Sequence, residues 1–546
     1  MSSRSIDRRA AEMSVAYVLT AFLFFGVAAL AGLLQGLVRG GVITLPKWVN
    51  YYQLLTAHGV LMALVFTTFF ILGFFYAGMA KTITLPRVST NLGWIGWAMM
   101  FFGTTMATAT ILIGDASVMY TFYAPLKASP WFYIGATLLI VGSWVTGAGM
   151  IYAYTKWRKA NQGQLSPLFA FMAVATMVLW YIATLGVAAE VLLQLIPWSF
   201  GWVPTVNVVL SRMLFWFFGH PLVYFWLMPA YAAWYNCVPK IVGAKIFSDS
   251  LARLTFVLFI LLSIPVGFHH QLTEAGISEK WKIVHVALTL GVVLPSMMTA
   301  FSMFATFETV GREKGSRRLF GYFKKLPWGD VRFFAPFIGM VMFIPAGIGG
   351  IINTSNQLNQ VIHNTIWVTG HFHLTVATSV ALTFFGVSYW LIPSLMGRKL
   401  TKRIHKLGIF QTILWTVGML IMSGAMHFMG LLGVPRRTDY TTYMDDLIGL
   451  SWMKYETLMA IGGALLFVAA MLMVGIVIYL WKYAPVGEEE FPMADSQPML
   501  QHTPRVLEKW KLWIALTALL ILISYGYPVY DAIVHAPPGA PPMKTW

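Results

Sequence analysis

Six histidines in this sequence have the residue type and the positions to bind metal ions inside a membrane. Titratable side chains are costly at bilayer depth, where they usually face a pocket, a partner or a metal. One buried histidine is often a hydrogen-bonded structural residue, but six favour metal binding, because neutral imidazole is the commonest metal ligand. The six are His58, His220, His269, His270, His371 and His373.

The spacing of these histidines assigns them to different helix faces. His371 and His373, in WVTGHFHLT, are two residues apart, and in a helix their side chains point about 200° from each other. They therefore cannot bind one metal, but they can bind two cofactors on opposite sides. His269 and His270 are adjacent, which suits two ligands of one site only where a helix is ending.

Residues with hydroxyl groups lie on the same helix face as His220. Tyr224 is four residues after His220 in GHPLVY and shares its face, so the phenol can lie beside whatever His220 binds. Further hydroxyls follow on the same helix and on a second apolar segment, and we predict that they form a proton path. Each is weak evidence alone, because Ser and Thr also bond their own helix carbonyls. The predicted path is Tyr231, Tyr235, Ser296, Thr299 and Ser302.

The elements that position these residues are membrane helices. The chain has 546 residues, of which 58% are hydrophobic and only 10% charged, with a mean hydropathy of +0.70, and this excludes a soluble globular protein. A span needs about 20 apolar residues, and we predict an all-α polytopic protein with about thirteen transmembrane helices. The expected spans are 13–37, 53–80, 92–113, 131–154, 167–195, 213–238, 252–270, 283–308, 333–353, 366–392, 408–432, 456–481 and 510–530.

The distribution of positive charge predicts the orientation. The net charge is +17, and most of the 37 lysines and arginines lie in the N-terminal segment and in the loops on its side, which the positive-inside rule places in the cytoplasm. We therefore expect a cytoplasmic N-terminus, an outside C-terminus and no nucleic-acid partner. With this topology all six histidines lie within roughly 12 Å of the outer hydrocarbon boundary. We expect residues 1–546 to form one transmembrane catalytic domain, with a cytoplasmic linker at 483–509 before the last helix.

The motifs WFFGHPLVYFW, VGFHHQ and HNTIWVTGHFHL together resemble subunit I of the heme-copper respiratory oxidases, over essentially all thirteen spans. The resemblance implies that architecture and a terminal oxidase activity. Such an enzyme reduces dioxygen to water with four electrons at a high-spin heme and a copper called CuB, coupled to proton uptake from the cytoplasm and to proton translocation. One cysteine, Cys237, leaves no paired-thiolate metal site in this chain.

The resemblance also implies the heme ligands. His58 and His373 become the axial pair of a six-coordinate, low-spin heme, which can only pass electrons, and His371 becomes the proximal ligand of a five-coordinate, high-spin heme. Arg436 and Arg437, in GVPRR, become partners of the heme propionates, because arginine forks suit carboxylates.

For the copper, the resemblance implies His220, His269 and His270 as ligands. It also makes Tyr224 and His220 catalytic, with a covalent bond between the Tyr224 ring and His220. Tyr224 can then supply an electron and a proton. His363 would lie near the heme propionates.

Departures from the larger A-type oxidases favour the B-type, or ba-type, with a single proton path. Leu222 stands where A-type members carry a glutamate, and Asn364 follows His363 where they carry an aspartate near a magnesium site. We expect a low-spin heme b, a high-spin heme a or o, and copper. Expected partners are a small subunit II that receives the electrons, further small subunits, cytochrome c or a quinol, dioxygen and the lipid of a prokaryotic plasma membrane.

Three other functions stay open at this point. A quinol oxidase differs only in its electron donor. A nitric-oxide reductase shares the six histidines but uses non-heme iron, which favours an added carboxylate, and lacks the active-site tyrosine, so Leu222 and Tyr224 count against it. A secondary transporter is a remote alternative, because transporters place ionisable residues near the midplane and often show inverted repeats.

Overall fold

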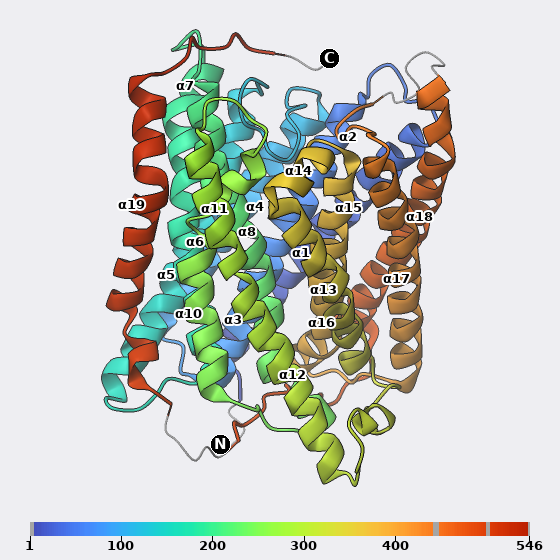
Figure 1. The fold of residues 1–546 in the computed structure, drawn as a ribbon. Coiled ribbons are helices and arrows are strands. Elements are labelled where there is room, and N and C mark those ends of the chain that lie inside the picture. Colours follow the sequence, from blue (N-terminus) through green and yellow to red (C-terminus); the bar gives the residue numbers. More distant parts are fainter. Residues whose placement is uncertain (1–4, 440–446, 498–502, 544–546) are drawn as a thin grey trace.

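The computed structural model describes residues 5–439, 447–497 and 503–543, and in these ranges the chain is helical, without β-strands (Figure 1). Twelve helices there are long and apolar enough to cross a membrane. They run side by side, and α1 and α19 bring the two ends of the chain to opposite ends of the bundle (Figure 1). This confirms the all-α polytopic fold. The single domain over 1–546 stays a prediction.

Several of the twelve spans join more than one helical element, so their bounds are given together. They are α1 (Arg8–Arg39); α2, η1 and α3 (Tyr51–Gly59, Val60–Phe66, Thr67–Thr82); α4 (Arg87–Leu112); α5 (Pro130–Ala160); α6, η2 and α7 (Leu168–Glu190, Val191–Leu195, Ile196–Ser199); α8 and α9 (Val208–Asn236, Val238–Val242); α11 and α12 (Glu279–Gly291, Val293–Glu313); α13 (Val331–Thr354); α15, η5 and α16 (Ile366–Leu374, Thr375–Val380, Ala381–Met396); α17 (Lys402–Leu431); α18 and η6 (Leu447–Ile478, Tyr479–Tyr483); and α19 (Trp510–Val534).

The thirteenth predicted span, 252–270, is present as two shorter elements. Helix α10 (Asp249–Ser263) has 15 residues, and a 3-10 turn, η3 (Gly267–Gln271), follows it. Pro265 lies between them, where its ring and missing N–H do not allow the α-helix to continue. His269 and His270 therefore stand on a separate turn after the helix.

Short π-helical segments interrupt the spans that carry the candidate heme ligands. Segment η1 begins at Val60, two residues after His58, and η5 begins at Thr375, two residues after His373. A π-segment adds one residue to a turn and is frequent at functional sites. The hydrophobic pattern does not reveal these segments, because the helices are apolar on both sides of them.

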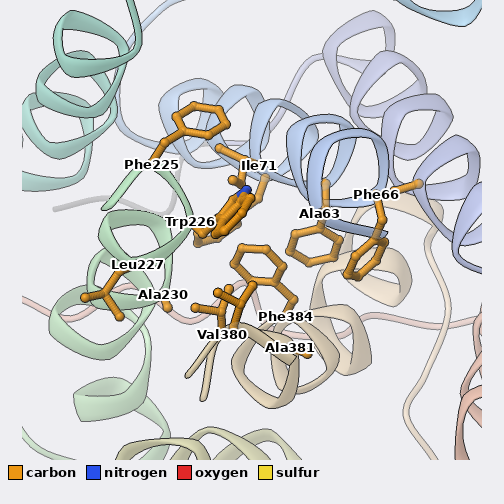
Figure 2. Close-up of a cluster of buried hydrophobic side chains, with 14 of the residues drawn as sticks. Ala63, Phe66, Ile71, Phe225, Trp226, Leu227, Ala230, Val380, Ala381 and Phe384 are labelled. Atoms are coloured by element: carbon orange, nitrogen blue, oxygen red, sulfur yellow. The ribbon is translucent and has the colours of Figure 1, made fainter. Parts of the chain in front are cut away.

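Aromatic packing fills the interior next to these segments (Figure 2). Phe66 of η1, Phe384 of α16 and Trp226 of α8 meet there, and the Phe70 and Phe384 rings stack at 4.4 Å. Phe384 is 1% exposed and Trp226 is 2% exposed. This cluster fixes the part of each of these spans that follows its candidate histidine ligand.

The predicted linker, 483–509, packs on the bundle where it is described. Ile246 donates a backbone hydrogen bond to Asp495, and Gln497 returns one to Ile246, each 2.9 Å long. Residues 498–502 of this linker lie outside the described residues. A short 3-10 turn, η7 (Arg505–Glu508), then leads into α19.

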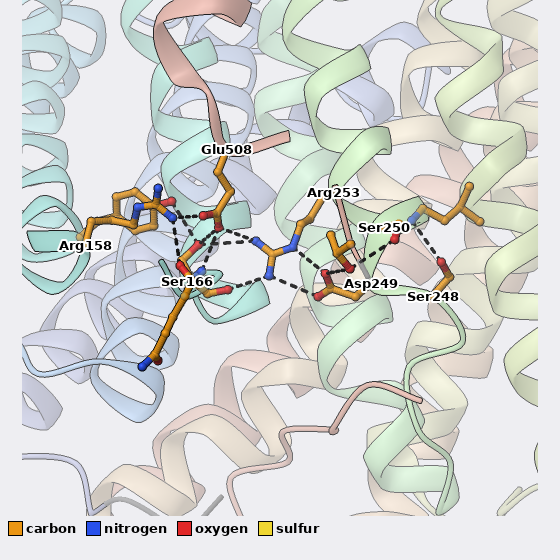
Figure 3. Close-up of polar contacts among 11 residues, drawn as sticks. Arg158, Ser166, Ser248, Asp249, Ser250, Arg253 and Glu508 are labelled. Carbon is orange, nitrogen blue, oxygen red and sulfur yellow. Dashed lines mark hydrogen bonds and ion pairs between the residues drawn. The ribbon is translucent and has the colours of Figure 1, made fainter. Parts of the chain in front are cut away.

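Glu508 ties the start of α19 to three other segments (Figure 3). Its carboxylate accepts hydrogen bonds from Arg253 of α10, from Arg158 of α5 and from Ser166; the Arg253 Nη1 to Oε1 distance is 2.8 Å. The side chains of Arg253 and Glu508 are only 2% and 3% exposed. Asp249 binds the other edge of the Arg253 guanidinium at 2.7 Å, so this buried cation has two carboxylate partners.

Candidate metal and heme centre

His220, His269 and His270 converge into a compact group. His220 comes from α8 and the other two from η3, and one ring nitrogen of each lies within 4.8 Å of the others. His220 Nδ1 is 3.1 Å from His270 Nε2. Two nitrogens bonded to one metal at about 2 Å in tetrahedral geometry lie roughly 3.3 Å apart, so the three imidazoles fit a single ion such as copper.

Tyr224 lies beside this group, as its spacing predicts. Its ring centre is 5.2 Å from that of His220, which is one turn earlier on α8. His220 Nε2, the nitrogen opposite the one that approaches His270, is buried and has no hydrogen-bond partner among the described residues. His220 therefore has one nitrogen for a metal and one for a different partner.

His58 and His373 face each other across the interior. Their ring planes are parallel within 8° and their centres are 6.1 Å apart. His58 Nδ1 bonds to the carbonyl of Ala28 at 2.9 Å and His373 Nδ1 to that of Thr369 at 2.8 Å, which leaves Nε2 of each ring to face a metal. Two imidazoles that share a metal through bonds of about 2 Å have ring centres roughly 6 Å apart, so the pair fits one iron.

Glycines keep backbone close to the candidate heme ligands. A Cβ on Gly32 of α1 would lie 2.6 Å from His58 Nδ1, and a Cβ on Gly349 of α13 would lie 2.6 Å from His371 Nδ1. Any larger side chain would push either ring out of place. The Ala346 backbone also bonds to His371, so His371 packs against α13 and His373 against His58, as the two-face prediction requires.

The arginine pair lies in the loop after α17 with unused hydrogen-bond donors. Arg436 Nε and Arg437 Nη2 are buried and without a partner among the described residues. Arg436 also donates to the Asn364 side chain at 3.0 Å, and Arg437 packs over the Tyr120 ring at 5.3 Å. His363 Nε2 is similarly unpartnered. The unused N–H groups of the two arginines fit carboxylates like heme propionates. In His363, Nδ1 donates to the Asn359 side-chain oxygen at 2.9 Å, so its Nε2 carries a lone pair.

Electrostatics agrees with an anion site in this loop region. Burial alone would raise the pKa of Tyr123, but Arg437, Arg212 and Arg436 outweigh it and lower the pKa to about 8. Burial and the neighbouring Arg437 lower the pKa of Arg436 to about 10. Burial and Arg436 lower the pKa of His363 to about 4. The cluster therefore carries positive charge that a carboxylate would offset.

The predicted proton path is partly joined by hydrogen bonds. The Tyr235 hydroxyl donates to Thr299 at 3.1 Å, and Tyr231 bonds to Ser296. The Ser302 hydroxyl is buried beside Tyr235. Both bonded pairs connect α8 to α12, so the two stripes that the sequence predicts on separate helices form one ladder.

Sequence reasoning missed the groups behind the metal ligands. His285 and Thr289 of α11 and Tyr525 of α19 bond to the η3 turn or to His269 itself. His427 packs edge to face on Trp367, whose ring stacks with that of His371. Helical spacing gives no signal for the contacts of His285, Thr289, Tyr525 and His427, because each of them joins two different elements.

We compared the chain with known protein families and with known proteins. The family described as "Cytochrome C and Quinol oxidase polypeptide I" matches residues 12–465. The chain is 39% identical over 543 residues to the cytochrome c oxidase subunit 1 of Thermus thermophilus, a match that covers 97% of this chain and 96% of that protein. The chain belongs to this family.

A solved heme-copper terminal oxidase dimer contains a chain that superposes on this oxidase subunit with a TM-score of 0.92 at 37% identity, covering 98% and 95% of the two chains. A probable cytochrome c oxidase subunit 1-beta of Nocardia farcinica is 28% identical and covers 83% of this chain and 76% of its own length. The protein is thus the catalytic subunit of a membrane-embedded terminal oxidase, and the family prediction is confirmed. The B-type resemblance agrees with the Thermus relative.

Proposed function

We propose that this oxidase subunit reduces dioxygen to water with four electrons at a centre formed by His371, the three-histidine group and Tyr224. The observation that carries the proposal is the group itself: three imidazole nitrogens within 4.8 Å of one another, with the Tyr224 ring 5.2 Å from that of His220. A heme iron and a copper supply the binding site and three of the electrons when they are bound. Tyr224 supplies the fourth electron and a proton.

The residues divide between electron transfer and chemistry. We assign His58 and His373 to a low-spin heme, because their two facing rings would both hold one iron, which would then pass electrons without a site for a gas. We assign His371 to the high-spin heme, and His220, His269 and His270 to CuB. Their side chains hold the cofactors, while Arg436 and Arg437 bind propionates with their unused donors and His363 lies near them.

Protons reach Tyr224 from the cytoplasmic side in this proposal. The Tyr235–Thr299 and Tyr231–Ser296 pairs give hydroxyls that can pass protons along α8 and α12, with Ser302 at the lower end. Leu222 leaves no carboxylate at the end of an A-type second path, which supports a single path. Uptake from the cytoplasm, with translocation of further protons, stores the energy of the reaction.

The B-type resemblance supports proposals for the electron donor, the heme types and the membrane location. We propose cytochrome c as the electron donor through a small subunit II, a low-spin heme b, and a high-spin heme of the a or o type. The subunit would lie in a prokaryotic plasma membrane, with its N-terminus in the cytoplasm and its C-terminus outside.

One set of measurements on the purified enzyme tests the proposal. Pyridine hemochrome analysis and metal analysis should give two hemes and one copper for each chain, and reduced cytochrome c should support oxygen consumption. Two hemes with non-heme iron in place of copper, together with nitric-oxide turnover, would identify a nitric-oxide reductase. Activity with a quinol but not with cytochrome c would identify a quinol oxidase, and absence of heme would return the transporter alternative.

A further inference from the structure

We propose that Tyr525 of the last helix and His285 of α11 are positioning residues that hold the η3 turn, and with it the two copper ligands His269 and His270. This inference rests on the proposed copper site. Neither residue is close enough in sequence to the ligands to be found by spacing. Both act through the backbone of the turn rather than on the metal.

The backbone of η3 needs partners from outside. The first N–H groups of any helical turn have no acceptor within it, and in η3 these belong to Gly267 and Phe268. Gly267 donates to the Tyr525 hydroxyl at 2.9 Å, and Phe268 donates to His285 Nδ1 at 3.1 Å. Two side chains from two other helices therefore satisfy the start of the turn.

There is also no room for a side chain at Gly267. A Cβ on Gly267 would lie 2.3 Å from both the Trp216 carbonyl oxygen and the Tyr525 hydroxyl. The turn is thus wedged between α8 and α19. A glycine is required here for close approach of the two helices to the ligand turn.

The hydrogen bonds of His285 fix its tautomer. Because Nδ1 accepts from Phe268, the proton lies on Nε2, which donates to the Ser524 carbonyl of α19 at 3.2 Å. The His285 ring also stacks on Phe268 at 4.1 Å. His285 therefore bridges η3 and α19, and it is fully buried.

Helix α11 also fixes the tautomer of His269, one of the proposed copper ligands. Thr289, one turn after His285, donates its hydroxyl proton to the His285 carbonyl at 2.6 Å. Its oxygen is then free to accept from His269 Nδ1 at 2.9 Å, and the same Nδ1–H reaches the Val266 carbonyl at 2.6 Å. The Nε2 lone pair of His269 is left for a metal, as outer hydrogen bonds commonly arrange for ligating histidines.

Helix α19 lies outside the part of the chain that the family description matches, which ends at residue 465. Tyr525 therefore lies beyond the matched residues and His285 within them, while the Thermus relative aligns over 97% of this chain. Asn207, which caps α8, donates to the Ala532 carbonyl at 2.8 Å and secures α19 beside the helix that carries His220. All three copper ligands thus depend on elements that contact α19.

The test compares Tyr525→Phe with the matched control Tyr527→Phe, whose residue is 52% exposed on the same helix. Copper retention is measured in the purified oxidase by competition with a copper(I) chelator. Loss of such an outer hydrogen bond typically weakens metal binding by about 10- to 100-fold, so we expect that loss in Tyr525→Phe and none in Tyr527→Phe. Equal retention in both variants would overturn the role of Tyr525.

A second pair of variants tests His285. His285→Asn keeps an acceptor near the position of Nδ1, whereas His285→Leu removes it, so the first should retain copper and the second should lose it. The infrared stretch of carbon monoxide transferred by light to the copper should shift or broaden in His285→Leu and Tyr525→Phe. Two hemes per chain verify folding. Copper missing from the unmodified enzyme would refute the copper site. Copper held equally by all variants would refute only the positioning role of Tyr525 and His285.

Discussion

At the scale of single residues, His220 has different uses for its two ring nitrogens. Nδ1 approaches His270 within the proposed copper site, while Nε2 is buried without a hydrogen-bond partner among the described residues. A buried imidazole nitrogen without a hydrogen bond is costly. The covalent bond to Tyr224 that the family resemblance implies would remove this cost at Nε2 and would keep the phenol next to the metals.

Replacement of Tyr224 by Phe tests its chemical role. We expect both hemes to remain, because the ring still fills its space, and oxygen consumption to fall by roughly 10²-fold or more, the size of effect of losing a proton donor in the reaction. Tyr389→Phe is the control, since Tyr389 is also fully buried and its hydroxyl has no partner among the described residues. Full activity of Tyr224→Phe would remove this tyrosine from the reaction.

Replacement of His373 by Ala tests the assignment of the two faces of α15. The low-spin heme spectrum should disappear, since one axial ligand is lost, while the high-spin heme bound to His371 should remain. His405→Ala, at the start of α17, should leave both spectra unchanged. Loss of the high-spin signal in place of the low-spin signal would show that the two faces are exchanged.

At the scale of elements, α8 and α12 form the proposed proton ladder together. Thr299→Val removes the acceptor of Tyr235, which lies 3.1 Å away, so oxygen reduction should slow by about tenfold or more, in the range of lost proton transfer groups. Reduction of the low-spin heme by the donor should keep its rate. Thr176→Val on α6 is the control, because its hydroxyl bonds to the carbonyl of its own helix. Unchanged oxygen reduction in Thr299→Val would argue against the ladder.

The Glu508 network holds α19 at its first turn. Glu508→Gln leaves the buried Arg253 with Asp249 as its one carboxylate partner among the described residues, and breaking a buried pair costs about 3–5 kcal/mol. We expect a clearly lower midpoint in thermal denaturation followed through heme absorbance. Glu490→Gln breaks the exposed pair with Lys240, which is worth about 0–1 kcal/mol, and should change the midpoint little. Similar shifts in both variants would show that the network does not stabilise α19.

The sequence could predict which residues gather as candidate ligands because most of them lie in short motifs, and for His220 and Tyr224 the helical spacing determines the shared face. Their roles as ligands stay a prediction. The sequence could not predict the π-segments after His58 and His373. The helical register changes at these segments, but the residues before and after them are equally apolar. Nor could it pair Glu508 with Arg253 or Tyr525 with Gly267. Those contacts join residues more than 250 positions apart, and only the folded chain brings them together.

At the scale of the whole molecule, the bundle was predictable from the apolar runs, since lipid allows few alternatives to helices. The exception is 252–270, where Pro265 divides the predicted span into α10 and η3. Hydropathy alone reads such a segment as one helix. The break matters, because it places His269 and His270 on a turn that can direct adjacent residues to one metal.

Orientation can be tested with single thiols, because the one native cysteine, Cys237, is buried. We expect a membrane-impermeant maleimide to label Lys47→Cys, in the exposed loop after α1, in intact cells. Gln162→Cys, in the exposed loop after α5, should react only after the membrane is opened, since the two loops lie on opposite sides in the predicted topology. The reverse pattern would invert the topology and would move the proposed proton path to the outside.

The π-segments η1 and η5 separate each of their spans into two halves that can change independently. One additional residue turns everything that follows by about 100°. The histidine before each segment and the aromatic residue after it, Phe70 for η1 and Phe384 for η5, therefore do not share one regular register. Relatives without such a segment would need a one-residue gap at 60–66 or 375–380 to align correctly. Evolution could thus have rearranged the inner half of these helices while the iron-facing imidazoles kept their direction.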